Sequence, residues 1–515
     1  MDGRYGAWLA CVWVFAGCSA APSQVPASRV SDGGPGGVAD GTGARSSGDL
    51  TDGGMGRQRL RAFTTVVPGS QAEQARDVTV DTAGHIIITG GTHSPDFPVD
   101  HDLRAIGGDT ATGSAGPMWV FVMKLDAAGG VIWSTLLGGP NYDRAYAVEV
   151  DEAGDIYVAG RAGPGFPTTA GVVQPRFAGD ASPNDAYGQQ DGFILKLKLR
   201  ADGAGVVWST YFGDGDLSFI RDLDVDATGN VYVALHTRGP FPHVTPAADQ
   251  TAPGGGYDVV VARLDPAADR VAWATYLGGA GDEEVPTIRV DDHGRVFVVT
   301  ATTSDGLATA GAYQFRRAGD SDMLVARYTP AGVRDATTYY GGSAAEHVET
   351  HHLALDAGGR AVFGALTTSA DLPLPGTPSP LQPRYGGDGD GFVGILSSDL
   401  TDLVAATYIG GRAGEHVEGM AVDAGGHVYV GGETRSDTLP STGAVFQGAS
   451  DAWVAKLSPG LDRTLWLEYL GGSSRDAQRA LWIDADANVI STGWTNFEGF
   501  FDGSGDVYVA RILMP

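Results

Sequence analysis

The chain is poor in cysteine and in basic residues. Of its 515 residues only two are cysteines, Cys11 and Cys18, so everything after the N-terminal segment must be stable without disulfide bonds. Lysine and arginine number 34 against 62 acidic residues, which gives a formal net charge of −28. This charge argues against nucleic acid and anionic lipid headgroups as direct partners, because both would be repelled. Cations, basic proteins and neutral glycans remain open as partners.

The N-terminal apolar run is too short to cross a bilayer. Residues 7–17 read AWLACVWVFAG, which is the length of a signal-peptide core. The run ends in FAGC, which resembles the lipobox of bacterial lipoproteins. This resemblance implies that residues 1–18 are a lipoprotein signal and that the thiol of Cys18 carries the lipid. The alternative is an ordinary secretory signal, and either one predicts export.

Residues 19–58 have no apolar periodicity and are rich in Gly, Ser, Pro and Asp. Such a composition cannot bury a core, so we expect a disordered tether behind the anchor. By the same resemblance to lipoproteins, Ser19 after the cysteine favours the outer membrane. The expected location is the outer membrane or cell surface, facing the periplasm or the exterior, with the lipid as the only membrane contact.

The remainder of the chain is repetitive. The pattern V-x-V-D-x-x-G-x-x-Y-V-x-G-x-T recurs, in degenerate form, seven times at intervals of about 67 residues. Each copy alternates apolar residues around a D-x-x-G or similar turn, which is typical of a tight β-hairpin. The turn aspartates are Asp81, Asp151, Asp226, Asp291, Asp356, Asp423 and Asp484. A second hairpin follows each first one, so the unit has four strands, as in a propeller blade.

The two ends of the repeat region complement each other. Residues 60–69 match only a fourth strand, whereas the last unit stops after its third strand at residues 506–513. Pairing of these two strands would close the ring and leave no sheet edge exposed. The sequence therefore predicts an all-β fold, a seven-bladed β-propeller of four-stranded blades over residues 59–515, closed by its N- and C-terminal strands.

These repeats resemble the SBBP β-propeller repeat family of bacterial exported and surface proteins. The resemblance is carried by the V-D-x-x-G hairpins, by THSPDFP from Thr92, by GAYQ from Gly311 and by WSTYFG from Trp208. It covers about residues 60–515 and implies the propeller fold. It implies little about chemistry, because the family is defined largely by its repeat.

Acidic residues recur in the links between blades, four residues after the terminal Gly-Gly or its equivalent. They are Glu73, Asp143, Glu283, Glu346, Glu415 and Asp476, and only Ser218 breaks the series. The fold would place them in a ring near the mouth of a central channel, where they could attract Ca²⁺ or a cationic group of a ligand. The alternative is that each carboxylate accepts backbone N–H bonds from its own link or the next blade.

Other polar features favour structural roles. A turn aspartate bonds to nearby backbone N–H groups whatever the function, and tryptophans at one place in the outer strand, such as Trp208 and Trp273, are explained by packing between blades. The run EHVETHH at residues 346–352 holds three histidines, but alternation along a strand sends His351 and His352 to opposite faces, which disfavours zinc.

No G-x-S-x-G, H-E-x-x-H or cysteine nucleophile follows Cys18. We therefore expect a non-enzymatic, monomeric surface lipoprotein without a cofactor, calcium excepted, that binds an unknown protein or glycan. Its binding face should carry the long loops between second and third strands, of which residues 166–190 form the longest. The alternative is a propeller-fold hydrolase or lyase that acts on extracellular polysaccharide with acids drawn from different blades.

Overall fold

The computed structural model describes residues 61–105, 113–181, 183–200, 203–349, 351–439, 445–496 and 505–514. The predicted signal with Cys18 and the predicted tether of residues 19–58 lie outside this part of the chain. Within it the regular elements are β-strands, and no helix is long and apolar enough to cross a membrane.

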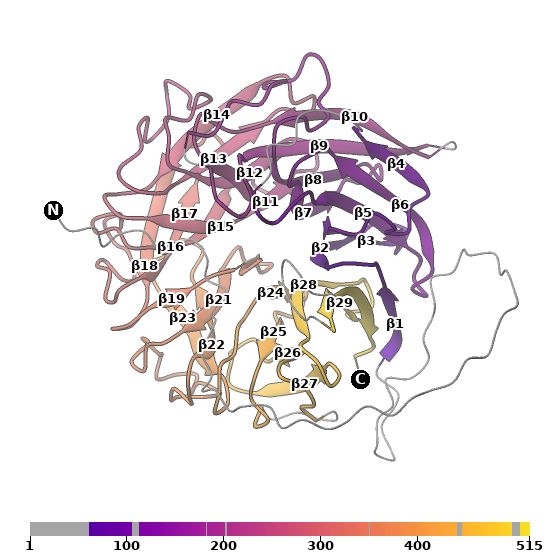
Figure 1. The fold of residues 1–515 in the computed structure, drawn as a ribbon. Helices are drawn as coiled ribbons and strands as arrows, with labels where there is room; N and C mark the ends of the chain where they lie inside the picture. Colours follow the sequence, from indigo (N-terminus) through magenta and orange to yellow (C-terminus); the bar gives the residue numbers. More distant parts are fainter. Residues whose placement is uncertain are drawn as a thin grey trace, which may run out of the picture. The chain divides into compact units, whose positions relative to one another are not determined.

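The strands form seven antiparallel sheets that follow one another around a ring, which confirms the predicted seven-bladed propeller (Figure 1). From the centre outward, blade 1 contains β2 (Glu73–Val80), β3 (Ile86–Thr92), β5 (Trp119–Leu125) and β6 (Val131–Gly138). Blade 2 contains β7 (Arg144–Val150), β8 (Ile156–Ala162), β9 (Asp191–Arg200) and β10 (Gly203–Tyr211). Blade 3 contains β11 (Ser218–Val225), β12 (Val231–Thr237), β13 (Asp258–Leu264) and β14 (Val271–Leu277).

The remaining blades have the same order. Blade 4 contains β15 (Glu283–Val290), β16 (Val296–Thr302), β17 (Asp322–Tyr328) and β18 (Arg334–Tyr340). Blade 5 contains β19 (Glu346–His347) and β20 (Leu353–Leu355), then β21 (Ala361–Thr367), β22 (Asp390–Leu396) and β23 (Leu403–Ile409). Blade 6 contains β24 (Gly419–Val422), β25 (Val428–Thr434), β26 (Asp451–Leu457) and β27 (Thr464–Leu470). Blade 7 contains β28 (Ala477–Ile483), β29 (Val489–Thr495), β30 (Asp506–Ile512) and β1 (Arg61–Val67).

Blade 7 combines the two ends of the repeat region. β1 pairs antiparallel with β30, with Val67 opposite Val507 and Phe63 opposite Arg511. The C-terminal strand is therefore paired on both sides, since β29 is its other neighbour. This confirms the predicted closure, and the join removes the edge that an open ring would expose.

The inner hairpins turn at the seven predicted aspartates. In blade 1 one carboxylate oxygen of Asp81 accepts the backbone N–H groups of Ala83 (2.9 Å) and His85 (2.8 Å). The turn aspartates of the other six blades make the same two bonds, to the residues two and four positions later. These carboxylates therefore hold the turns, as the sequence predicted.

Each blade packs its apolar side chains against those of the next. The indole N–H of Trp208 donates to the carbonyl oxygen of Pro266 (3.0 Å) in blade 3, and that of Trp273 donates to Pro330 (3.1 Å) in blade 4. Both rings are buried among hydrophobic residues. The tryptophans of the outer strands thus join neighbouring blades, which confirms their predicted packing role.

Two features were not predicted. A short strand, β4 (His101–Arg104), adds to the outside of blade 1 by parallel pairing with β6. In blade 5 the innermost strand is divided into β19 and β20, because the segment from Glu346 to Asp356 has two residues more than the equivalent segment from Glu283 to Asp291. Between these two strands, His351 has a positive φ of 44° and its side chain contacts backbone oxygens of blades 1 and 2.

Candidate functional site at the axis of the propeller

The six acidic residues predicted to form a ring lie at or just before the innermost strand of each blade, and all are buried. The Glu346 carboxylate accepts the backbone N–H of Gly342 (3.2 Å) and the hydroxyl of Thr367 (2.7 Å). The Glu415 carboxylate accepts the corresponding Gly411 N–H (2.8 Å) and Thr434 hydroxyl (2.9 Å). Most of the series repeats this pattern, as the bonds of Glu73, Asp143, Glu283 and Asp476 show.

These carboxylates accept hydrogen bonds from their own blades and links. In blade 3, where Ser218 breaks the series, Asp214 takes over the bond to the Thr237 hydroxyl. Within the described residues, no group of three or more His, Cys, Asp or Glu is arranged to hold a metal ion. The structure therefore has the geometry of the alternative weighed from the sequence, in which each acid bonds to its own link, and it does not bring the six acids together.

Burial perturbs these carboxyl groups strongly. Desolvation raises the pKa of Glu73, Asp143, Glu346 and Glu415 to about 7, although hydrogen bonds to hydroxyl or backbone N–H groups act in the opposite direction. The first residue of the third strand adds a second buried acid in most blades, such as Asp191, whose pKa burial raises to about 8. The blades thus contain protonatable buried acids near neutral pH.

The three histidines of residues 346–352 are not gathered into one site. The Nε2 atom of His351 lies 3.0 Å from the carbonyl oxygen of Arg76 and 3.1 Å from that of Tyr146, so it connects blade 5 with blades 1 and 2. The Nδ1 atom of His352 instead lies 3.0 Å from the hydroxyl of Thr287 in blade 4. The two side chains point to different neighbours, as predicted, but strand alternation is not the reason, because both residues lie between β19 and β20 and His351 has a positive φ.

A second position of the innermost strands faces the axis. The pairing of β2 with β3 shifts register between Ala75 and Asp77, so Arg76 lies at a β-bulge. The equivalent shifts in β7, β11 and β28 place Tyr146, Arg221 and Arg479 at bulges. A bulge re-aims its side chain, and here it brings residues from separate blades together.

Four arginines surround the ring of Tyr146, and we call Arg76, Arg144, Arg161 and Arg221 the arginine cluster. Their guanidinium carbons lie 5.6, 5.0, 5.7 and 4.9 Å from the ring centroid. Arg144 and Arg161 are opposite each other on β7 and β8, and the Phe219 ring stacks on Tyr146 with centroids 6.1 Å apart. The cluster is therefore a mixed cationic and aromatic site shared by blades 1, 2 and 3.

The cluster is buried and strongly positive. Arg76 is 5% exposed and Arg161 is 3% exposed. Burial by itself would raise the pKa of the Tyr146 hydroxyl, but the charges of Arg144, Arg161 and Arg221 outweigh it and lower that pKa to about 8. A local field that eases the ionisation of a buried phenol also favours other anions.

The arginine of blade 7 next to this cluster is charge-balanced, although its guanidinium group and that of Arg76 both lie over the Trp494 ring. Arg479 of blade 7 has the same strand position as Arg76, but its guanidinium group forms an ion pair with the carboxylate of Glu418 in blade 6. Nearby, the Arg475 guanidinium lies 3.5 Å from the carboxylate of Glu433. Charges at the axis are thus paired in blades 6 and 7, whereas the arginine cluster surrounds an aromatic ring.

The longest loop reaches the arginine cluster. The ring of Tyr187 lies 3.9 Å from the guanidinium carbon of Arg161, and its centroid lies 4.8 Å from that of Tyr142. The side-chain amide of Gln190 donates to the backbone oxygen of Tyr142 (3.1 Å). The loop predicted as a binding element therefore lies beside the arginine cluster.

The bulge residues could have been located in the sequence, because each lies three positions after the residue that is acidic in most of the links. No such pattern in the sequence indicates Arg161.

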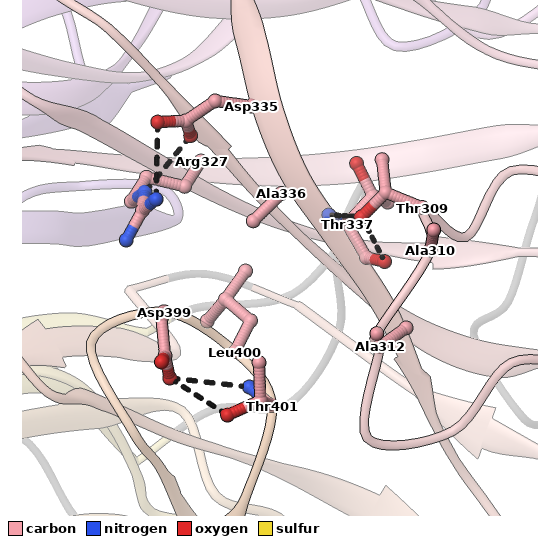
Figure 2. A pocket seen from close by; sticks show the side chains of 11 residues that line it. Thr309, Ala310, Ala312, Arg327, Asp335, Ala336, Thr337, Asp399, Leu400 and Thr401 are labelled. Carbon is pink, nitrogen blue, oxygen red and sulfur yellow. Dashed lines mark hydrogen bonds and ion pairs between the residues drawn. The ribbon is translucent and has the colours of Figure 1, made fainter.

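Two hollows lie between blades 4 and 5. The first, of about 220 Å³, is lined by the loop of residues 309–312, by the Arg327–Asp335 ion pair and by residues 399–401 (Figure 2). The second, of about 610 Å³, lies among long loops and links, with Arg316, Arg317 and Asp371 on its walls. The first hollow has two carboxylates on its walls, Asp335, which is paired with Arg327, and Asp399.

Comparison with known proteins agrees with the fold. Residues 132–166 match the family model of the SBBP β-propeller repeat. The regulatory protein FlaEY of Caulobacter vibrioides is 21% identical over 440 residues, which cover 81% of this chain and 42% of that protein. The chain thus spans less than half the length of this curated relative.

The solved structures that are similar to this chain are more distant. BamB from Moraxella catarrhalis has a TM-score of 0.35 and 12% identity, with 87% of this chain and 95% of that chain covered. The polysaccharide lyase Uly1 has a TM-score of 0.44 and 9% identity, with coverage of 87% and 91%. Likeness at this level carries no argument about function. From its fold the chain is a seven-bladed β-propeller, and its residues 132–166 match the SBBP β-propeller repeat.

Proposed function

We propose that the protein is a non-enzymatic binding module of the bacterial surface, anchored through a lipid on Cys18. It uses the face of the propeller that carries the long loops to bind a protein or glycan partner. The lipobox-like sequence before Cys18 and the polar segment behind it support the anchor and the tether. In this proposal the protein acts as a monomer, contacts the membrane only through its lipid, and binds no nucleic acid.

The observation that carries the proposal is the position of the longest loop. Tyr187 and Gln190 of this loop contact Arg161, near the end of β8, and Tyr142, just before β7. A variable loop on a rigid scaffold, next to buried charged and aromatic side chains, is a common basis of recognition. This arrangement supports a binding role more directly than a catalytic one.

The test is a glycan and protein array probed with the purified full-length protein. We expect a partner whose binding is weakened by Tyr187→Ala, while Arg463→Gln on the distant outer turn of blade 6 leaves it unchanged. Arg463→Gln should unfold at the parental urea concentration, and Tyr187→Ala, which loses the ring contacts to Arg161 and Tyr142, should still be folded in the array buffer. Binding that Tyr187→Ala does not alter would contradict the use of this face.

The same protein should be incubated with a panel of extracellular polysaccharides. The binding-module proposal expects no release of reducing ends or unsaturated products. Turnover of any of these substrates would instead establish the alternative, a hydrolase or lyase built on the propeller.

A further inference from the structure

We propose that the arginine cluster binds a compact oxyanion, a carboxylate, sulfate or phosphate group carried by the ligand. This inference rests on the proposed function, because it names the chemistry that the long-loop face would recognise. It concerns a single small group, since the arginines are too buried to line an extended groove.

The first argument is the missing counter-charge. Within the part of the chain that the structure describes, no carboxylate oxygen lies within 4.0 Å of a guanidinium nitrogen of Arg76, Arg161 or Arg221. In the same set of residues, Nε and Nη1 of Arg76 and Nε of Arg161 and Arg221 are buried without a hydrogen-bond partner. Buried cations without a paired anion are unfavourable, so such groups are usually kept for binding one.

The second argument is the comparison with blade 7. Arg479 occupies the strand position of Arg76 and Arg221, and the fold there accommodates an ion pair with Glu418. Acidic residues are abundant in this chain, with 62 Asp and Glu against 34 Lys and Arg. In the described residues, the lack of an ion-paired carboxylate at Arg76, Arg161 and Arg221 is thus a property of these three positions and not of the propeller in general.

The third argument is geometry. Guanidinium groups offer planar forks of N–H donors that match the oxygens of carboxylate, sulfate and phosphate. Here the donors come from β2, β7, β8 and β11, and the Tyr187 ring of the long loop lies against Arg161. An oxyanion at this place would be held by several strands and would be coupled directly to the predicted binding loop.

The test uses thermal unfolding and titration calorimetry of the full-length protein at pH 6.5. The probes are sodium acetate, glucuronate, sulfate and phosphate, each compared with sodium chloride at equal ionic strength. We expect at least one probe to raise the unfolding temperature in a saturable manner, because it binds only the folded state. Acetate and glucuronate report a carboxylate site, whereas sulfate and phosphate report a tetrahedral one.

Arg161→Gln should weaken the binding of that probe by about tenfold or more, because one charge-assisted contact is lost. Arg463→Gln, whose side chain is 71% exposed on the outer turn of blade 6, makes the same charge change and should leave the affinity unaltered. If Arg161→Gln does not fold, the half-buried Arg221 provides the second variant, Arg221→Gln, with the same expected loss.

The inference fails if no probe produces a saturable rise, or if the affinity in Arg161→Gln and Arg221→Gln equals that of the parent. A rise that grows linearly with sulfate in every variant is a general salt effect and also overturns it. If a partner found on the array still binds the Arg161→Gln variant, the oxyanion site is wrong but the binding-module proposal holds. If a small oxyanion binds but the array yields no partner, the oxyanion site holds and the binding-module proposal is not supported.

Discussion

Raising the pH from 5 to 8 should destabilise this protein, and the buried acid of blade 5 is the clearest place to test it. Glu346 is fully buried beside the Gly342 N–H and the Thr367 hydroxyl, and burial raises its pKa from 4.5 to about 7. The folded protein therefore keeps a proton that the unfolded chain releases. The stability linked to Glu346 is present in full below pH 4.5 and is lost as the pH rises through about 7.

The size of the effect follows from the shift. One pKa unit corresponds to about 1.4 kcal/mol, so the Glu346 shift corresponds to roughly 3 kcal/mol of unfolding free energy between the two ends of the window. Glu73, Asp143 and Glu415 act in the same direction. Glu346→Gln removes the titrating group but keeps an acceptor for the Thr367 hydroxyl. The variant should lose part of the pH dependence even if its stability at pH 5 is lower.

The assay is urea unfolding followed by tryptophan fluorescence at pH 5, 6, 7 and 8. The parent should lose unfolding free energy across this range, and Glu346→Gln should lose about 1 to 3 kcal/mol less. Asp388→Asn, at an exposed position of the same blade, makes an equal change of charge and should retain the parental slope. A parent whose stability rises from pH 5 to 8, or a Glu346→Gln slope equal to the parental one, would refute the reasoning.

Four further predictions follow from the anchor, the closure and the axis. Cys18→Ser should release the protein from the membrane fraction; if it still sediments with membranes, the lipid anchor is wrong. Deletion of the residues after Gly505 removes β30, which pairs with two strands, so the truncated protein should aggregate or melt far below the parent. His351→Ala removes an imidazole shared by two backbone carbonyl groups and should cost about 1 to 3 kcal/mol in urea unfolding, whereas an unchanged midpoint would show that this contact is dispensable. Calcium should leave the unfolding temperature unchanged, since the link carboxylates bond to their own blades; a rise that is abolished by replacing Glu346 and Glu415 together with Gln would restore the cation ring.

The blade architecture could be predicted because it depends on local sequence patterns. Asp81 and its six equivalents form their turns through bonds to residues two and four positions away, and alternation decides which strand residues are buried. The closing pair of β1 and β30 was predictable for a related reason: each end of the repeat region lacks what the other supplies. The division of the innermost strand of blade 5 could not be predicted, because two surplus residues do not show whether a strand bulges or breaks.

The candidate site could not be predicted, because its residues are far apart along the chain. The sequence located six recurring acids, but their burial and their bonds to Gly and Thr of the same blade appear only once the strands are packed. His351 and Arg76, which are 275 positions apart, meet only because the ring closes. The Arg161 side chain gains its neighbours from a long loop and from blade 3, and no local pattern indicates either.

The sequence by itself determined the repeat and the turns of this propeller, because they depend on hydrogen bonds and burial patterns within one unit, and it determined the closure because each end of the repeat region lacks a strand that the other has. The tertiary structure alone decided which charges meet at the axis. There, residues that vary between otherwise similar repeats are brought together. Arg479 is paired with Glu418, whereas in the described residues no carboxylate lies within 4.0 Å of the Arg76, Arg161 or Arg221 guanidinium group. Charge interactions fall off with distance in space and not along the chain, so this balance depends on the folded ring.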